Sequence, residues 1–119
     1  ALMRWAERRE VLHAVDRTSQ LINGDFKAEH VFCGAGAGGA DVVVDWQRPY
    51  RAPAEIDIVS LLESAQIDPA PHVAPVAIRL RAFLFVHWAA EAKTHLLPQL
   101  GLFDQWARMG IDTILTSQH

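Results

Sequence analysis

The spacing of apolar residues predicts a helix at the start of the chain. From Leu2 to Ile22, apolar positions recur at helical spacing, and charged residues lie between them. This period gives an α-helix one apolar face that can be buried. Asn23-Gly24 then interrupts the pattern, and this pair is typical of a turn. We therefore predict a single amphipathic helix over residues 2–22.

Two short apolar runs in the middle of the chain predict a β-hairpin. The first is His30–Cys33 and the second is the valine-rich Asp41–Trp46, and the segment GAGAGGA joins them. This segment also fits the dinucleotide-binding pattern G-x-G-x-x-G, at Gly34, Gly36 and Gly39. That motif needs a helix after it to receive the pyrophosphate, whereas a strand pattern follows here. We therefore predict a hairpin over residues 30–46 and no nucleotide site at its glycines.

The second half of the chain predicts helices separated by proline-rich connections. QRPYRAPAE is predicted to be a loop, because its two prolines cannot donate backbone hydrogen bonds. Three helices are then expected, at about Ala54–Ala65, Val76–Lys93 and Leu102–Leu115. The middle helix is apolar nearly all round, so we expect it to be central and buried and to end by Pro98.

Length and composition indicate one domain over residues 1–119, mainly α with a small β-hairpin and hence of the α+β class. A net charge of −3 gives no basic surface for nucleic-acid phosphates, and no apolar run is long enough to span a bilayer. We therefore expect a cytoplasmic protein without a nucleic-acid or membrane partner. Cys33 has no second cysteine to pair with, and we expect Cys33 and His87 to be buried in the core.

Charged residues gather in NGDFKAEH, Asn23–His30, between the predicted helix and the hairpin. The second hairpin strand ends at Asp45, twenty positions after Asp25. A hairpin can bring a loop carboxylate and a strand-end carboxylate together, as phosphoryl transfer requires. One carboxylate accepts the proton of the substrate hydroxyl, and the other holds the metal ion that bridges the nucleotide phosphates. By themselves, Asp25 and Lys27 are equally typical of a solvated turn.

Three segments, in this order, resemble the kinase-like superfamily and in particular its aminoglycoside phosphotransferase and choline kinase branch. NGDFKAEH is similar to the catalytic loop, whose pattern is H-x-D-x-x-x-x-N, and VVVDWQ is similar to the metal-binding strand end. APAEIDIVSLL is similar to the next segment, in which an aspartate braces the catalytic loop. The resemblance covers about residues 21–62 and implies the C-terminal lobe of a protein-kinase-like fold.

The resemblance implies a role for each matching residue. Asp25 would be the catalytic carboxylate, and Lys27 would lie near the transferred phosphate. Asp45 would be the principal Mg²⁺ ligand, and Asp57 would accept hydrogen bonds from the loop backbone. The implied cofactors are Mg²⁺ and ATP or GTP, and the implied phosphate acceptor is a hydroxyl group of a small molecule.

Two positions depart from the family pattern. Asn23 stands where the family has histidine, and its side chain can still support the loop by hydrogen bonding. His30 stands at the second metal position, where the family has asparagine. Mg²⁺ prefers oxygen ligands, whereas imidazole suits softer metals, so the resemblance leaves His30 as a questionable metal ligand.

No segment of the chain resembles the family's N-terminal lobe, which covers the adenine. We therefore expect the chain to be a fragment of a longer kinase that carries this lobe, and to be inactive by itself. One alternative is a non-catalytic lobe that acts as a binding or dimerisation module, for instance as a homodimer. Another is a helical domain whose loop only mimics the kinase motif.

Overall fold

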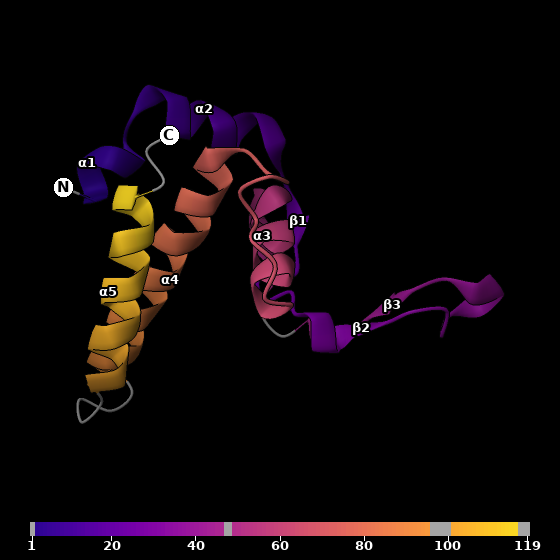
Figure 1. Cartoon of the computed structure of the whole chain (residues 1–119). Coiled ribbons are helices and arrows are strands. Elements are labelled where there is room, and N and C mark those ends of the chain that lie inside the picture. The colour runs from indigo at the N-terminus through magenta and orange to yellow at the C-terminus, as the bar shows by residue number, and fades with distance from the viewer. Residues whose placement is uncertain (1, 47–48, 96–100, 117–119) are drawn as a thin grey trace.

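The computed structural model describes residues 2–46, 49–95 and 101–116. In this part of the chain the fold is mostly helical with two small antiparallel sheets, which is compatible with the α+β class. Figure 1 shows a pair of long helices beside a small helix-and-strand unit, with a hairpin that projects from that unit. None of the described helices is long and apolar enough to cross a membrane.

The N-terminal segment is not one helix, so the prediction for residues 2–22 was wrong. It forms helix α1 (Leu2–Ala6), helix α2 (Arg9–Thr18) and strand β1 (Ser19–Ile22). The backbone of Arg8 is extended, with φ −62° and ψ 142°, which ends α1 and lets α2 start in a new direction. Trp5 on α1 and Val11 on α2 are both buried in the same core cluster, so the break lets both short helices face it.

Strand β1 pairs with a strand in the segment that was predicted to be a loop. Strand β4 (Tyr50–Pro53) runs antiparallel to β1, with Ser19 opposite Pro53 and Ile22 opposite Tyr50. The loop prediction was therefore wrong for these four residues. The proline in β4 is its last residue, at the end of a two-stranded sheet where a missing N–H costs least.

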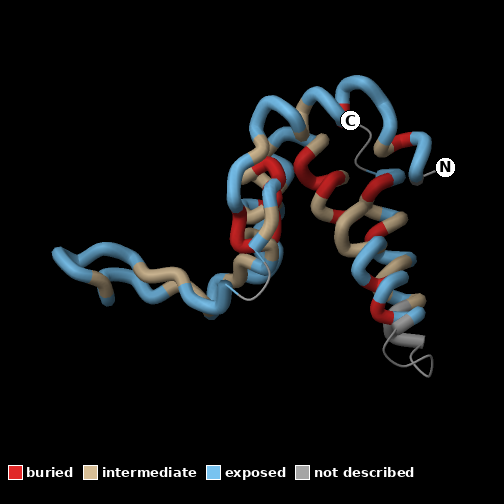
Figure 2. The backbone as a smooth tube through the Cα atoms, turned by 180° about the vertical axis from the view of Figure 1, so that it is seen from behind, coloured by how far each residue is buried: buried red, intermediate tan, exposed pale blue. Residues whose placement is uncertain are grey.

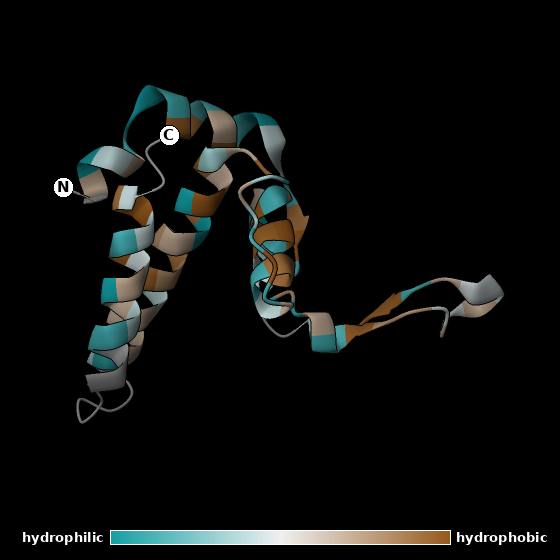
Figure 3. Ribbon diagram, viewed as in Figure 1, coloured by the Kyte–Doolittle hydropathy of each residue, from teal (hydrophilic) through white to brown (hydrophobic). Residues whose placement is uncertain are grey.

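The predicted hairpin is confirmed, although its strands are shorter than the apolar runs. A 3₁₀-helix, η1 (Ala28–His30), leads into β2 (Val31–Phe32), and η2 (Ala37–Gly39) leads into β3 (Val42–Val43). The hairpin projects from the rest of the molecule, and Figure 3 shows hydrophobic residues on its strands. Cys33 is exposed there, so its predicted burial was wrong because no neighbouring element covers this part of the hairpin.

The three predicted C-terminal helices are confirmed to within a few residues. They are α3 (Glu55–Ser64), α4 (Pro75–His95) and α5 (Gly101–Thr116), and α4 packs along α5. Pro98, the predicted end of α4, lies outside the described residues. The C-terminal half of α4 is not buried all round, because His87 is exposed and Trp88 is 39% exposed. The core role predicted for His87 was therefore wrong.

The main core joins both ends of the chain. Its buried members are Trp5, Val11, Ile22, Ala52, Ile56, Leu80, Ala82 and Ile114. Figure 2 shows that buried positions are concentrated on the helices and the β1–β4 unit, whereas the hairpin is exposed or only partly buried. The radius of gyration of the Cα atoms is 15.3 Å. A compact domain of this length would have a radius of gyration of about 13.5 Å. The molecule is therefore more extended than a compact domain, and the projecting hairpin contributes to this shape.

Candidate functional site

Asp57 fixes the backbone of the loop that follows β1. It lies in the first turn of α3, and its two carboxylate oxygens accept hydrogen bonds from successive backbone N–H groups. The distances are 2.6 Å from Asn23 N to Oδ2 and 2.9 Å from Gly24 N to Oδ1. Gly24 has φ +85°, a left-handed conformation that favours glycine. The sharp turn after β1 is thus held by a carboxylate from a different element.

The side chain of Asn23 connects the loop to the end of the hairpin. Asn23 is only 2% exposed, so its amide group must find partners inside the protein. Its Nδ2 donates to the backbone oxygen of Asp45 at 3.4 Å, and its Oδ1 accepts from the backbone N–H of Asp25 at 3.1 Å. One buried side chain therefore forms hydrogen bonds with the backbones of Asp25 and Asp45, the two residues whose carboxylates were predicted to take part in phosphoryl transfer.

The charged groups of Asp25 and Lys27 lie at the surface beside this buried bridge. The Lys27 ammonium is 3.6 Å from Asp25 Oδ2, and the two side chains are 44% and 59% exposed respectively. No hydrogen bond from the described residues engages the Asp25 carboxylate itself. Solvent and a substrate can therefore reach this carboxylate, while its backbone is held by Asn23.

His30 and Asp45, the two residues matched to metal positions, lie side by side at the base of the hairpin. His30 Nε2 is 3.3 Å from Asp45 Oδ2, and the backbone N–H of Val44 donates to the His30 oxygen at 3.0 Å. Asp45 has φ +64°, which is uncommon for a residue with a side chain. The other ring nitrogen of His30, Nδ1, is buried and has no hydrogen-bond partner among the described residues.

Two further residues lie near the loop and were not predicted from the sequence. The Ser64 hydroxyl accepts from the backbone N–H of Ala28 at 2.8 Å and donates to Leu61 O. Burial raises the pKa of Tyr50; the positive charge of Arg81 lowers this pKa, and the carboxylates of Asp57 and Asp25 raise it further. Neither residue belongs to a sequence motif, so only the tertiary structure reveals that they lie near the loop.

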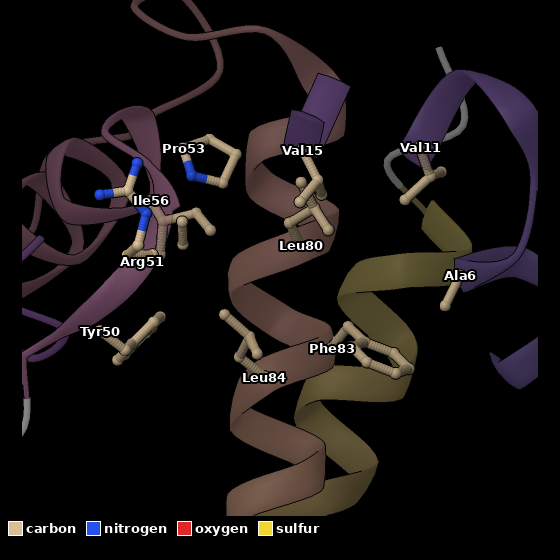
Figure 4. A pocket seen from close by; sticks show the side chains of 11 residues that line it. Ala6, Val11, Val15, Tyr50, Arg51, Pro53, Ile56, Leu80, Phe83 and Leu84 are labelled. Atoms are coloured by element: carbon tan, nitrogen blue, oxygen red, sulfur yellow. The ribbon is translucent and has the colours of Figure 1, made fainter. Parts of the chain in front are cut away.

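Two hollows in the described part of the chain differ in size and chemistry. The one at the loop is about 110 Å³ and is lined by Asn23, Phe26, Val43, Trp46 and Asp57. It is smaller than the pockets of about 300–1,000 Å³ that hold small molecules. The other is an almost entirely apolar pocket of about 250 Å³ between α2, β4, α3 and α4 (Figure 4). Neither hollow by itself suits a nucleoside triphosphate.

The residues present fit a Mg²⁺ site only in part. Asp45 offers the oxygen ligand that Mg²⁺ prefers, but the atom beside it is an imidazole nitrogen. No group of three or more histidine, cysteine or acidic side chains that could hold a metal ion occurs in the described part of the chain. Any ion here would therefore take most of its ligands from water or from a bound phosphate.

Hydrogen bonds connect Asn23 to the carboxylate of Asp57 and to the backbones of Asp25 and Asp45, and His30 lies against Asp45. Their chemical roles stay predictions. Comparison of the chain with protein-family models, with curated proteins and with solved structures finds no match.

Proposed function

We propose that this chain is the C-terminal lobe of a phosphotransferase that transfers the γ-phosphate of ATP or GTP to a hydroxyl group of a small molecule. The observation that carries the proposal is the bridge made by buried Asn23. It bonds to the backbones of Asp25 and Asp45, while Asp57 holds the same turn from α3. A solvated turn that merely mimics the motif does not need a buried amide and a bidentate carboxylate to shape it.

In the proposed reaction, the acceptor oxygen forms a bond to the γ-phosphorus, and the bond between this phosphorus and the β–γ bridging oxygen breaks. The exposed carboxylate of Asp25 accepts the proton that the hydroxyl loses. The nucleoside diphosphate leaves with the electron pair of the broken bond. Such transfers depend mainly on positioning and on charge stabilisation.

Lys27 supports the proposal as the neighbouring cation. Its ammonium group lies 3.6 Å from Asp25 Oδ2 and is 44% exposed, so it can turn toward a phosphate oxygen without leaving a buried charge unpaired. A divalent cation at Asp45 would neutralise phosphate charge when bound.

The resemblance implies that a second, N-terminal lobe covers the nucleotide. The described residues contain two two-stranded sheets. Strands β1 and β4 form the sheet next to the loop, and β2 and β3 form the hairpin. We therefore expect turnover when such a lobe is present in the same protein, and only weak nucleotide binding by these 119 residues.

The test is the substitution Asp25→Asn in the full-length natural gene product. Phosphoryl transfer from ATP or GTP to a panel of amino alcohols and aminoglycosides is followed by ³¹P NMR. We expect loss of transfer with an unchanged thermal unfolding temperature, because the Asp25 carboxylate is exposed and only its backbone N–H supports the loop. Asp68→Asn, at another exposed turn acid, is the matched control. Transfer retained by Asp25→Asn would contradict the assignment.

A non-catalytic interaction module is the second candidate, and exposed apolar side chains near the loop favour it. Phe32, on β2, is 50% exposed, and Trp46, three residues after the end of β3, is 49% exposed. In that case the full-length protein would transfer no phosphate, and Trp46→Ser would shift its sedimentation from dimer to monomer. Transfer that depends on Asp25, together with unchanged sedimentation of Trp46→Ser, would exclude this candidate.

A further inference from the structure

We propose that the apolar pocket between α2, β4, α3 and α4 binds a small neutral aromatic molecule that carries one hydrogen-bonding group, such as an indole or a phenol. The pocket shares no lining residue with the hollow at the loop, so the proposed site is separate from the proposed phosphoryl transfer and does not rest on it. The ligand class follows from the size of the pocket, its lining and one hydroxyl group.

The walls of the pocket are apolar side chains from elements that are far apart in the sequence. Figure 4 shows Tyr50 of β4 and Leu84 of α4 on opposite sides of it. Ala52, Ile56 and Leu80 also line the pocket, and all three are buried members of the main core cluster. The main core therefore holds these walls in place.

The volume of the pocket suits a molecule of one or two rings. In another protein, an engineered apolar cavity of about 150 Å³ stays dry and binds benzene. The pocket here measures about 250 Å³, which leaves room for two fused rings. It lies just below the range of about 300–1,000 Å³ that holds drug-sized ligands, so the volume favours a smaller molecule. Water finds few hydrogen-bond partners at apolar walls, so an apolar ligand displaces it at little cost.

The lining favours a ligand without charge. Arg51 is the one charged residue among the described residues that line the pocket. It is exposed, and its Nη2 donates to the backbone oxygen of Ser19 at 3.4 Å, so its guanidinium group is engaged at the surface. A carboxylate or ammonium group would lose its hydration in the pocket without gaining a buried partner of opposite charge.

The hydroxyl group of Tyr50 is the polar group that a ligand can use. Tyr50 is partly buried in the wall of the pocket, and its hydroxyl has no hydrogen-bond partner among the described residues. A protonated tyrosine hydroxyl can both donate and accept a hydrogen bond. An aromatic molecule with an N–H or O–H at its edge can therefore pair with this hydroxyl while its rings contact the apolar walls. Pockets that combine mostly apolar walls with a few placed polar groups are typical of small-molecule sites.

The test is an NMR titration of the 119-residue chain with indole, with leucine and valine methyl groups labelled with ¹³C. We expect saturable shifts of the Val15, Leu80 and Leu84 methyl groups with a dissociation constant of about 0.1–1 mM. Nuclear Overhauser effects should connect the indole ring protons to the Leu80 and Leu84 methyl groups. Indole-3-acetate, which adds a carboxylate, should bind at least about tenfold more weakly. The absence of saturable shifts at these methyl groups, or equal affinities for the two ligands, would overturn the inference.

Two variants test the hydroxyl and the volume separately. Tyr50→Phe should lower the affinity for indole about three- to tenfold and leave the affinity for indene, which lacks the N–H, within about twofold. Equal losses for both ligands would overturn the assignment of a hydrogen-bonding ligand. Ala52→Leu, which adds side-chain volume to the pocket, should abolish binding, whereas Ala90→Leu on the exposed side of α4 is the matched control and should not. The Overhauser effects on the unsubstituted chain locate the site even if Ala52→Leu fails to fold.

A second copy of the chain is the competing occupant of the pocket, and the same labelled chain distinguishes it from a small molecule. Labelled and unlabelled chains are mixed, and sedimentation is measured with and without indole. Overhauser effects from unlabelled chains to the Leu80 and Leu84 methyl groups, together with a dimer that indole does not dissociate, would overturn the inference. A monomer whose Leu80 and Leu84 methyl groups contact indole supports it.

Discussion

Asp57 illustrates how one residue can set the geometry of the candidate site without taking part in its chemistry. Its carboxylate accepts hydrogen bonds from two successive backbone N–H groups, of Asn23 and Gly24. An ionised carboxylate has two oxygens with this capacity, whereas an amide side chain has one oxygen and a competing NH₂ donor. Since Asp57 is anchored in the first turn of α3, the loop is held to a helix and not only to its own neighbours.

We predict that Asp57→Asn lowers the free energy of unfolding by about 2–4 kcal/mol, because a buried backbone N–H loses its acceptor and meets an amide donor. Urea unfolding followed by tryptophan fluorescence measures this change. Hydrogen exchange of the Asn23 and Gly24 amides should accelerate at the same time. Asp68→Asn is the control, since Asp68 accepts from Ala70 N in an exposed turn, and it should cost less than about 0.5 kcal/mol. Equal effects of the two substitutions would contradict the bracing role of Asp57.

Some residues of the site were predictable from sequence and others were not. Asp25, Asp45 and Asp57 stand at recognisable distances from a turn, a strand end and a helix start, so their positions follow from local patterns. Ser64 and Tyr50 come near the loop only through packing of α3 and pairing of β4 with β1. No local pattern encodes such contacts, because they depend on which strand pairs with which.

At the scale of elements, local patterns predicted the helices of the second half of the chain well and failed over residues 2–22. Helix α5 repeats an apolar face over 16 residues, and α4 is apolar nearly all round over 21 residues, too long a run for a strand, so both positions are well determined. Residues 2–22 also showed helical spacing, yet they form two helices and a strand of four residues. Over only four residues, the alternating apolar pattern of a strand cannot be distinguished from the spacing of apolar residues in a helix. The partner strand β4 was not recognised either, because Pro49 precedes it and Pro53 is its last residue.

The contact between α4 and α5 depends on Gly110. A Cβ atom placed on this residue would lie 2.6 Å from Val86 Cγ2 and 3.2 Å from the backbone oxygen of Ala82. Contacts this short force a movement, and valine has little freedom to turn away. The glycine therefore allows the two helix backbones to approach, at the usual cost of about 1 kcal/mol in helix propensity relative to alanine.

We predict that Gly110→Ala destabilises the protein by about 1–2 kcal/mol, because overpacking outweighs the gain in helix propensity. Thermal and urea unfolding measure the change. In a Val86→Ala background the same substitution should cost about 1 kcal/mol less, because the shortest contact is gone. A stabilising effect of Gly110→Ala in the unsubstituted chain would show that α4 and α5 do not pack this closely.

At the scale of the whole molecule, the fold separates a stabilising body from a projecting arm. Trp5 from α1, Ile56 from α3, Leu80 from α4 and Ile114 from α5 share one core cluster, so both ends of the chain contribute to the same body. The hairpin beyond η1 extends away from this body (Figures 1 and 2). Hydrogen bonds in its outer part are internal, from Gly34 N to Asp41 and between Gly36 and Ala40.

This separation predicts that the outer hairpin can be removed without loss of stability. Residues 33–41 are replaced by Asn-Gly, which joins the paired residues Phe32 and Val42 by a two-residue turn suited to a β-hairpin. We expect the free energy of unfolding to stay within about 0.5 kcal/mol and the radius of gyration from X-ray scattering to fall. The deleted residues contribute nothing to the core and lie far from it, whereas His30 and Asp45 remain at the hairpin base. A loss of more than about 1 kcal/mol would mean that the arm packs against the body in solution, and an unchanged radius would contradict its projecting position.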